Sequence, residues 1–285
     1  MTSMNYGPSS SGLKTRAGEY FEAHSHDYRS EHYKTRAGSK WARHTALLKA
    51  IAELQLPLST TILDLGCGPG FLSRDLCRLG FTGVGLDQSR TMIDSCELDA
   101  SAEGILSSQW KFCVGDAEAL PFADGEVGVV VAAGLLEYMT TDDIMLREIY
   151  RVLAPGGWLI INVTNRRGYT GCLSPINLRI RRLPGFIPIA SLIKRVLVGS
   201  PVDAQRLDFI PRKHLCSEFR RTMHEHGLTV KKDIYMNFSL LPAPFCTLMS
   251  RLTGRVDGLL DALDGTCLRG MGSCYIALGQ KSSNQ

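Results

Sequence analysis

The chain has 285 residues, of which 44% are hydrophobic and 21% are charged, and its formal net charge is +4. This composition is that of an ordinary globular protein, and it excludes extended disorder, collagen and coiled coil. The charge is nevertheless uneven, because residues 61–164 contain 6 basic and 15 acidic side chains whereas residues 165–232 contain 14 and 4. We therefore expect an acidic region followed by a basic one.

Signals for export, membrane insertion and metal binding are missing from the sequence. No apolar run reaches the roughly 18 residues of a membrane span, and residues 1–20 are polar and rich in small side chains, unlike a secretory signal. We predict that residues 1–18 form a flexible tail. The nine cysteines include no C-x-x-C pair and no ligand-like spacing to histidine, so we expect reduced thiols, no bound metal and a cytoplasmic location.

Apolar runs then alternate with helical patterns, which is typical of a parallel sheet covered by helices. Strands buried on both faces are expected at 61–66, 82–87, 110–116, 127–133 and 157–164. Helices are expected at about 70–79, 89–99 and 141–153, the last one ending before a Pro-Gly-Gly sequence. The pattern breaks over 165–212 and resumes with a helix at about 213–226 and closing strands at 228–236 and 274–280.

The sharpest local motif is the glycine-rich sequence DLGCGPG at residues 64–70, between the first strand and the first helix of this alternation. Glycines let the backbone approach a ligand closely at the carboxyl edge, where open α/β sheets bind nucleotides. The spacing is G-x-G-x-G, which is neither the dinucleotide fingerprint nor a phosphate-binding P-loop. Asp87 ends the second strand, where a carboxylate can accept both ribose hydroxyls or, alternatively, cap the following helix. Together these features predict a nucleoside site.

Four segments, ILDLGCGPG, VGLDQS, GDAEALPFADGEVGVVVAAGLLEYM and REIYRVLAPGGWLIINVTN, together resemble the class I S-adenosylmethionine-dependent methyltransferases of small molecules. The resemblance implies a Rossmann-like, doubly wound α/β fold with a mostly parallel seven-stranded sheet whose last strand is antiparallel. It also implies a single methyltransferase domain over 19–285. Its parts would be a helical lid at 19–58, a cofactor-binding core at 59–164, a helical acceptor-side insertion at 165–212, and a closing helix and strands at 213–285.

The resemblance implies S-adenosyl-L-methionine as the cofactor and assigns residues to it. Asp64 would orient the methionine ammonium, Asp87 would take the ribose hydroxyls, and Asp116 would accept from the adenine amino group. The complete implied set is Tyr20, Tyr28, Asp64, Gly66, Gly68, Gly70, Asp87, Gln88, Met92, Asp116, Ala117, Ala133 and Leu135.

Methyl transfer from a sulfonium is an in-line displacement, so alignment of the reacting atoms in a dry site can supply much of the catalysis. The candidate catalytic residues are Tyr138, just after the fourth strand, and His24 and His26 in the sequence YFEAHSHDY, which resembles the lid segment of small-molecule methyltransferases. A tyrosine with an ordinary pKa of about 10 is a poor base at neutral pH, so we favour a positioning role for Tyr138.

The acceptor is the open question. Residues 183–198 are mostly apolar and lie among arginines, a pattern that fits a pocket for a small lipophilic acceptor, a peripheral contact of residues 165–200 with an anionic membrane, or a packed cap. Nucleic acid is disfavoured because residues 133–136 are AGLL rather than the Asp/Asn-Pro-Pro-Tyr/Phe of base methyltransferases. An RNA methyltransferase and a noncatalytic cofactor-binding protein remain alternatives, and the acceptor atom (oxygen, nitrogen or carbon) is left open.

Overall fold

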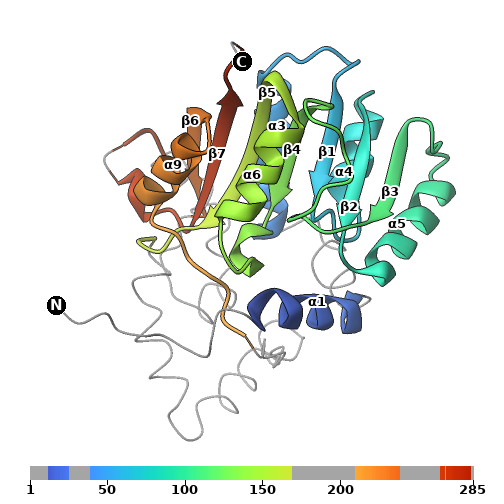
Figure 1. Ribbon diagram of the computed structural model, residues 1–285, viewed down its shortest axis with the longest axis horizontal. Helices are drawn as coiled ribbons and strands as arrows, with labels where there is room; N and C mark the ends of the chain where they lie inside the picture. Colours follow the sequence, from blue (N-terminus) through green and yellow to red (C-terminus); the bar gives the residue numbers. More distant parts are fainter. Residues whose placement is uncertain (1–11, 26–38, 169–208, 238–263, 267, 284–285) are drawn as a thin grey trace, which may run out of the picture.

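The computed structural model describes residues 12–25, 39–168, 209–237, 264–266 and 268–283. These residues form one open sheet with helices on both faces, and helix α1 (Leu13–Ala23) lies across the edge at which the parallel strands end (Figure 1). Within the predicted lid and insertion, residues 26–38 and 169–208 lie outside the described residues, and so do the predicted site residues His26 and Tyr28.

The sheet has seven strands in the order β3-β2-β1-β4-β5-β7-β6. Their bounds are β1 Thr61–Leu65, β2 Thr82–Asp87, β3 Trp110–Val114, β4 Val127–Ala133, β5 Leu153–Thr164, β6 Leu228–Met236 and β7 Cys274–Lys281. Strands β1 to β5 pair in parallel, and β7 runs antiparallel between β5 and β6. The predicted fold class is thereby confirmed. The strand order reverses between β1 and β4, and open α/β sheets bind ligands outside the carboxyl ends at such a point.

The helices divide between the two faces because alternate strand residues point to opposite sides. In β4, Val130 and Ala132 join the apolar cluster beneath α6 (Asp143–Val152) and α9 (Cys216–Glu225). The neighbouring Val129 and Val131 join the cluster beneath α3 (Ser39–Glu53) and α4 (Phe71–Arg78). Helix α5 (Arg90–Ala102) packs against β2 and β3. Burial on both faces explains the continuous apolar runs of the strands.

Two element boundaries differ most from the prediction. Strand β5 begins at Leu153 rather than 157, because the Pro-Gly-Gly sequence forms an irregularity within the strand: pairing shifts from Val127↔Leu153 to Val129↔Trp158. Helix α1 begins at Leu13, inside the residues predicted to form a tail, because Ala17 is buried against the rest of the protein. In the part of the chain that the structure describes, no helix is long and apolar enough to cross a membrane.

Candidate functional site

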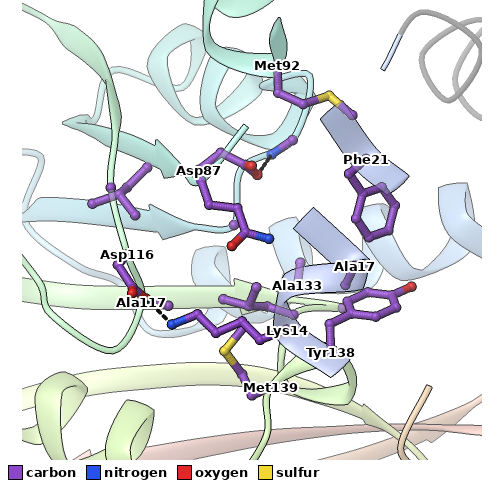
Figure 2. Close-up of a pocket in the computed structure, with 17 residues that line it drawn as sticks. Lys14, Ala17, Phe21, Asp87, Met92, Asp116, Ala117, Ala133, Tyr138 and Met139 are labelled. Atoms are coloured by element: carbon purple, nitrogen blue, oxygen red, sulfur yellow. Dashed lines mark hydrogen bonds and ion pairs between the residues drawn. The ribbon is translucent and has the colours of Figure 1, made fainter. Parts of the chain in front are cut away.

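A pocket opens at the carboxyl ends of β1 to β4, beneath α1 (Figure 2). It lies at the strand-order reversal, where the sequence motifs predicted a nucleoside site. The predicted residues that line it are Gly66, Gly68, Asp87, Gln88, Met92, Asp116, Ala117, Ala133, Leu135 and Tyr138. The fold thus brings together residues from β2, β4, η2 (Leu136–Tyr138) and the loops that follow β1 and β3.

The glycine loop needs glycine for two different reasons. Gly66, Gly68 and Gly70 all have positive φ angles, of 71°, 51° and 69°. A Cβ at Gly70 would lie 2.8 Å from Cys96 Sγ, so a side chain there is excluded by packing as well as by conformation. A Cβ at Gly68 would meet nothing within 4 Å, so this loop residue borders open space in the pocket.

Asp87 is fixed by backbone donors from both sides of the pocket. Its Oδ2 accepts from Gly68 N at 2.8 Å and its Oδ1 accepts from Ser89 N at 2.9 Å. Burial raises the pKa of Asp87, while these backbone hydrogen bonds oppose the shift. The alternative role as a helix cap falls to Ser89, whose hydroxyl accepts from Met92 N at the start of α5. Asp87 is therefore left to face the pocket.

Asp116, after β3, is held by one backbone and one side-chain donor. Its Oδ1 accepts from Glu118 N at 2.9 Å and from Lys14 Nζ at 2.6 Å. Although partial burial alone would raise it, the hydrogen bond from Lys14 lowers the pKa of Asp116. Lys14 also contacts Glu118 Oε2 at 2.5 Å (Figure 2 shows Lys14 directed at Asp116). Lys14 was not among the predicted site residues, because the polar sequence around it predicts a tail.

Asp64 lies behind the glycine loop and lines a second pocket, which shares Gly66, Gly68 and Ala133 with the first. The side chain is 1% exposed, and its Oδ2 accepts from Ser73 Oγ at 2.6 Å. Burial raises the pKa of the Asp64 carboxyl to about 6, against the smaller opposing effect of the Ser73 hydrogen bond.

Three basic side chains of α3 complete the second pocket and were also missed. Lys40, Arg43 and His44 follow the i, i+3, i+4 spacing that places side chains on one helix face. His44 is buried, with its Nε2 2.8 Å from Asp75 Oδ2. The spacing of three basic residues just before the first strand was the signal available in the sequence.

Four aromatic rings pack together near the α1 end of the first pocket, and two of them line it. Tyr138 makes edge contacts with Phe21 at 5.1 Å and with Phe209 at 5.9 Å between ring centroids. Tyr20 completes the group by edge contacts with Phe21 and Phe209, at 5.4 Å and 5.8 Å between ring centroids. Phe21 and Tyr138 line the pocket, whereas Tyr20 lies behind them. His24 stacks on Tyr20, and its Nδ1 lies 2.9 Å from the Tyr20 carbonyl oxygen, so it belongs to the back of the group.

Phe209 is held there by the residues that follow it. Arg212 N donates to Glu137 O at 2.8 Å, and the Arg212 side chain lies 2.7 Å from Asp142 Oδ1. His214 Nε2 reaches the same oxygen at 3.1 Å. Burial opposes the shift, but the hydrogen bond from His214 and the charge of Arg212 lower the pKa of Asp142. This chain segment therefore runs beside η2 and brings Phe209 to Tyr138.

Among the residues that the structure describes, no group of three or more histidine, cysteine, aspartate or glutamate side chains is placed to hold a metal ion. The described cysteines are free thiols. The chemistry of the two pockets is that of carboxylates, backbone amides, basic side chains and aromatic rings.

The central part of the chain is similar in sequence to known proteins. Residues 63–161 match the family model described as a methyltransferase domain. The chain is 37% identical over 117 residues to a 2-methyl-6-phytyl-1,4-hydroquinone methyltransferase of Synechocystis sp., covering 39% of this chain and 34% of that protein. It is 30% identical over 105 residues to a ubiquinone biosynthesis O-methyltransferase of Brucella anthropi, covering 37% and 41%. The matched segments span well under two thirds of either relative.

The fold has counterparts among solved structures. Magnesium protoporphyrin IX methyltransferase from Synechocystis, solved with bound S-adenosylhomocysteine, superposes with a TM-score of 0.62 at 16% identity, over 94% of this chain and 100% of that one. At this identity the likeness establishes a common fold.

Proposed function

We propose that this chain, whose residues 63–161 match the methyltransferase-domain family, is a class I S-adenosylmethionine-dependent methyltransferase that acts on a small lipophilic molecule. The observation that carries the proposal is the placement of three carboxylates. Asp64 lies in β1, Asp87 ends β2 and Asp116 follows β3, and all three line pockets that meet at the glycine loop. S-adenosylmethionine presents an ammonium group, two ribose hydroxyls and an adenine amino group, which are donors that these three acceptors complement.

The nucleoside end of the cofactor fits the first pocket. Each Asp87 oxygen accepts one backbone N–H and keeps acceptor capacity for one ribose hydroxyl. Asp116 would accept from the adenine amino group, beside the backbone amide of Ala117. Met92 and Gln88 would lie against the adenine ring. Open space next to Gly68 supports close approach of the ligand to the backbone.

The methionine end fits the second pocket. Asp64 would accept from the ammonium, and Arg43 and Lys40 supply the positive charge that a carboxylate needs. Backbone at Ala133 and Leu135 would border the methionine chain between the two pockets. An arginine is well suited to this task, because its planar guanidinium donates two parallel hydrogen bonds to a carboxylate.

S-adenosylmethionine supplies an electrophilic methyl group, which the acceptor takes with its own electron pair as the carbon–sulfur bond breaks. The protein's task is to hold the acceptor in line and to keep water out. Phe21 and Tyr138 provide apolar walls where the first pocket meets α1. We infer that Tyr138 positions the acceptor, because its ring is fixed by Phe21 and Phe209, whereas the His24 ring packs on Tyr20.

A lipophilic acceptor is supported by the apolar lining of the first pocket near Leu135, Tyr138 and Met139. The two named relatives are methyltransferases of a phytylated hydroquinone and of ubiquinone biosynthesis, which are in keeping with such an acceptor. The basic composition of residues 165–200 supports a peripheral contact with an anionic membrane, from which a lipophilic acceptor would be drawn. Salt-sensitive binding to anionic liposomes tests that contact.

The test of the activity uses cofactor with an isotopically labelled methyl group, incubated with the purified protein and a lipid-containing metabolite extract. Mass spectrometry is expected to find one or more labelled small molecules together with S-adenosylhomocysteine. Tight cofactor binding without any labelled product, across extracts of different origin, would instead identify a noncatalytic binder. Label found in RNA would redirect the assignment to nucleic acid.

A further inference from the structure

Helix α1 is attached at one end to the loop after β3 and at the other end to the first turn of α5, and both of these segments border the proposed nucleoside site. In its first turn, Lys14 Nζ contacts Asp116 and Glu118, after β3. In its last turn, the Glu22 carboxylate accepts from Thr91 N at 3.4 Å, and Thr91 Oγ1 donates to Glu22 O at 3.2 Å, after β2. The helix therefore spans the ends of two neighbouring strands and covers the pocket between them.

The middle of α1 rests directly on the pocket. Ala17 is 1% exposed, and a Cβ at Gly18 would lie 2.9 Å from Gln88 Nε2. Lys14, Ala17 and Phe21 all line the pocket, at the i, i+3, i+7 spacing of one helix face. The face of α1 that covers the pocket thus begins with Lys14, whose partner Asp116 is the carboxylate proposed to bind adenine.

The contacts of Asp116 are divided unequally between its two oxygens. Oδ1 accepts from both Glu118 N and Lys14 Nζ. Within the described parts of the chain, no hydrogen bond is made to Oδ2. The Lys14 side chain is 20% exposed and that of Asp116 is 49% exposed, so the contact between them is shielded on the Lys14 side alone. The more buried Glu118, at 18% exposed, holds the same ammonium group. Two donors on Oδ1 set the plane of the carboxylate and leave Oδ2 as the oxygen available to a ligand.

We propose that Lys14 is a positioning residue that orients Asp116 for the adenine 6-amino group and so couples seating of α1 to recognition of that group. The inference rests on the proposed function, because it assigns the ligand of Asp116 from it. It predicts that loss of Lys14 weakens binding chiefly of ligands that carry the 6-amino group. A lysine that merely held α1 in place would affect all purine ligands of this site equally.

The experiment measures dissociation constants of S-adenosylhomocysteine and of its analogue with hydrogen in place of the 6-amino group, by calorimetry. For Lys14→Met we expect affinity for S-adenosylhomocysteine to fall about tenfold, the loss of one charge-assisted contact, with a change of less than about twofold for the analogue. Lys14→Arg should restore most of the lost affinity. Lys111→Met, which removes an exposed lysine from β3, is the matched control and should leave both constants unchanged.

A double-mutant cycle shows whether Lys14 acts through Asp116. In an Asp116→Asn background, replacing Lys14 should cause no further loss of discrimination between the two ligands. A further tenfold loss in that background would overturn the proposal. If Lys14→Met does not fold, Lys14→Gln keeps a polar side chain of good helix propensity and removes the charge, and the same comparison is made with it.

The possible failures can be told apart. A wild-type protein that binds neither ligand would refute the proposed function itself. A wild-type protein that binds S-adenosylhomocysteine and prefers it, together with a Lys14→Met variant that loses affinity for both ligands equally or for neither, would refute only the role of Lys14.

Discussion

The two sides of the pocket are built by different means. On the proposed cofactor side, comprising the glycine loop and the carboxyl ends of β1 to β3, nearby backbone amides donate to the acids at the ends of β2 and β3, as Ser89 N does to Asp87 and Glu118 N to Asp116. Lys14 adds one long-range side-chain contact to Asp116. On the proposed acceptor side, comprising η2 and residues 209–214, the wall of the pocket depends on side chains that meet from distant parts of the chain. Arg212 and Asp142, for example, are 70 positions apart. We infer that local backbone contacts preserve the geometry for one cofactor, whereas long-range side-chain contacts can be exchanged to suit different acceptors.

The largest effect is expected at Asp87, which tests most directly whether the glycine-loop side of the pocket binds the cofactor. Asp87→Ala removes the proposed ribose acceptor and leaves Gly68 N and Ser89 N without their partner. Affinity for S-adenosylhomocysteine, measured by calorimetry, should fall by about 100-fold or more, since charge-assisted hydrogen bonds contribute about 1.5–3 kcal/mol each. Asp94→Ala, an exposed acid on α5, is the control and should change affinity less than about twofold. A similarly small loss for Asp87→Ala would remove Asp87 from the site.

Gly70 sharpens the claim that the glycine loop is shaped by packing as well as by backbone conformation. Gly70 and Gly104 have nearly equal φ angles of 69° and 72°, but only at Gly70 does a Cβ meet Cys96 Sγ, at 2.8 Å. Gly104→Ala should cost about 1 kcal/mol of unfolding free energy through conformation alone, and Gly70→Ala about 2–3 kcal/mol through added overpacking. Urea denaturation measures both. Cys96→Ala should recover part of the loss in the Gly70→Ala background, and equal losses at both glycines would contradict the packing argument.

Strands that form continuous apolar runs or that follow a turn glycine could be predicted from sequence, and β6, which follows Gly227, has the predicted bounds. Strand β4 has the predicted bounds because it is a continuous run of small or apolar residues in the sheet interior, and β2 is such a run up to its last residue, Asp87. Strand β5 starts early because its Pro-Gly-Gly sequence, which normally ends a helix, is accommodated as an irregularity in the sheet. The early start of β5 depends on its pairing with β4, and the local sequence alone does not indicate it.

The site residues likewise divide into those that could be predicted from the sequence and those that could not. Asp64, Asp87 and Asp116 were predicted because each lies within, ends or follows an apolar strand at a recognisable motif. Lys14 was missed because its partner Asp116 is 102 residues away and the surrounding sequence reads as a polar tail. Phe209 was missed for a similar reason, since its place beside Tyr138 depends on residues after the insertion folding back along η2.

The pH dependence of cofactor binding tests Asp64 on the cofactor side. Burial raises the pKa of Asp64 to about 6, so the ligand-free protein holds a proton there below that pH. A positively charged ammonium favours the ionised carboxylate, so binding releases the proton and affinity should rise as pH increases from 5 to 7. A group with a pKa near 6 gives about a tenfold rise over this range. The Asp64→Asn variant should bind the cofactor more weakly at pH 7 and should lose this tenfold rise. The His44→Gln variant shows how much the neighbouring imidazole contributes to the pH dependence.

The smallest effect is expected on the acceptor side, at Phe209. Phe209→Leu keeps an apolar side chain but removes the ring that packs edge-on against Tyr138 and Tyr20. Since such ring contacts contribute about 0.5–1.5 kcal/mol each, kcat/KM for the acceptor should fall about three- to tenfold as Tyr138 loses its fixed orientation. The dissociation constant of S-adenosylhomocysteine should stay within about twofold, because Phe209 does not line the cofactor pocket. Phe122→Leu, a partly buried ring away from the site, is the control for general loss of packing. If Phe209→Leu weakened S-adenosylhomocysteine as strongly as it slowed the acceptor, the two sides would share one rigid wall, and the acceptor side would not be free to vary independently of the cofactor side.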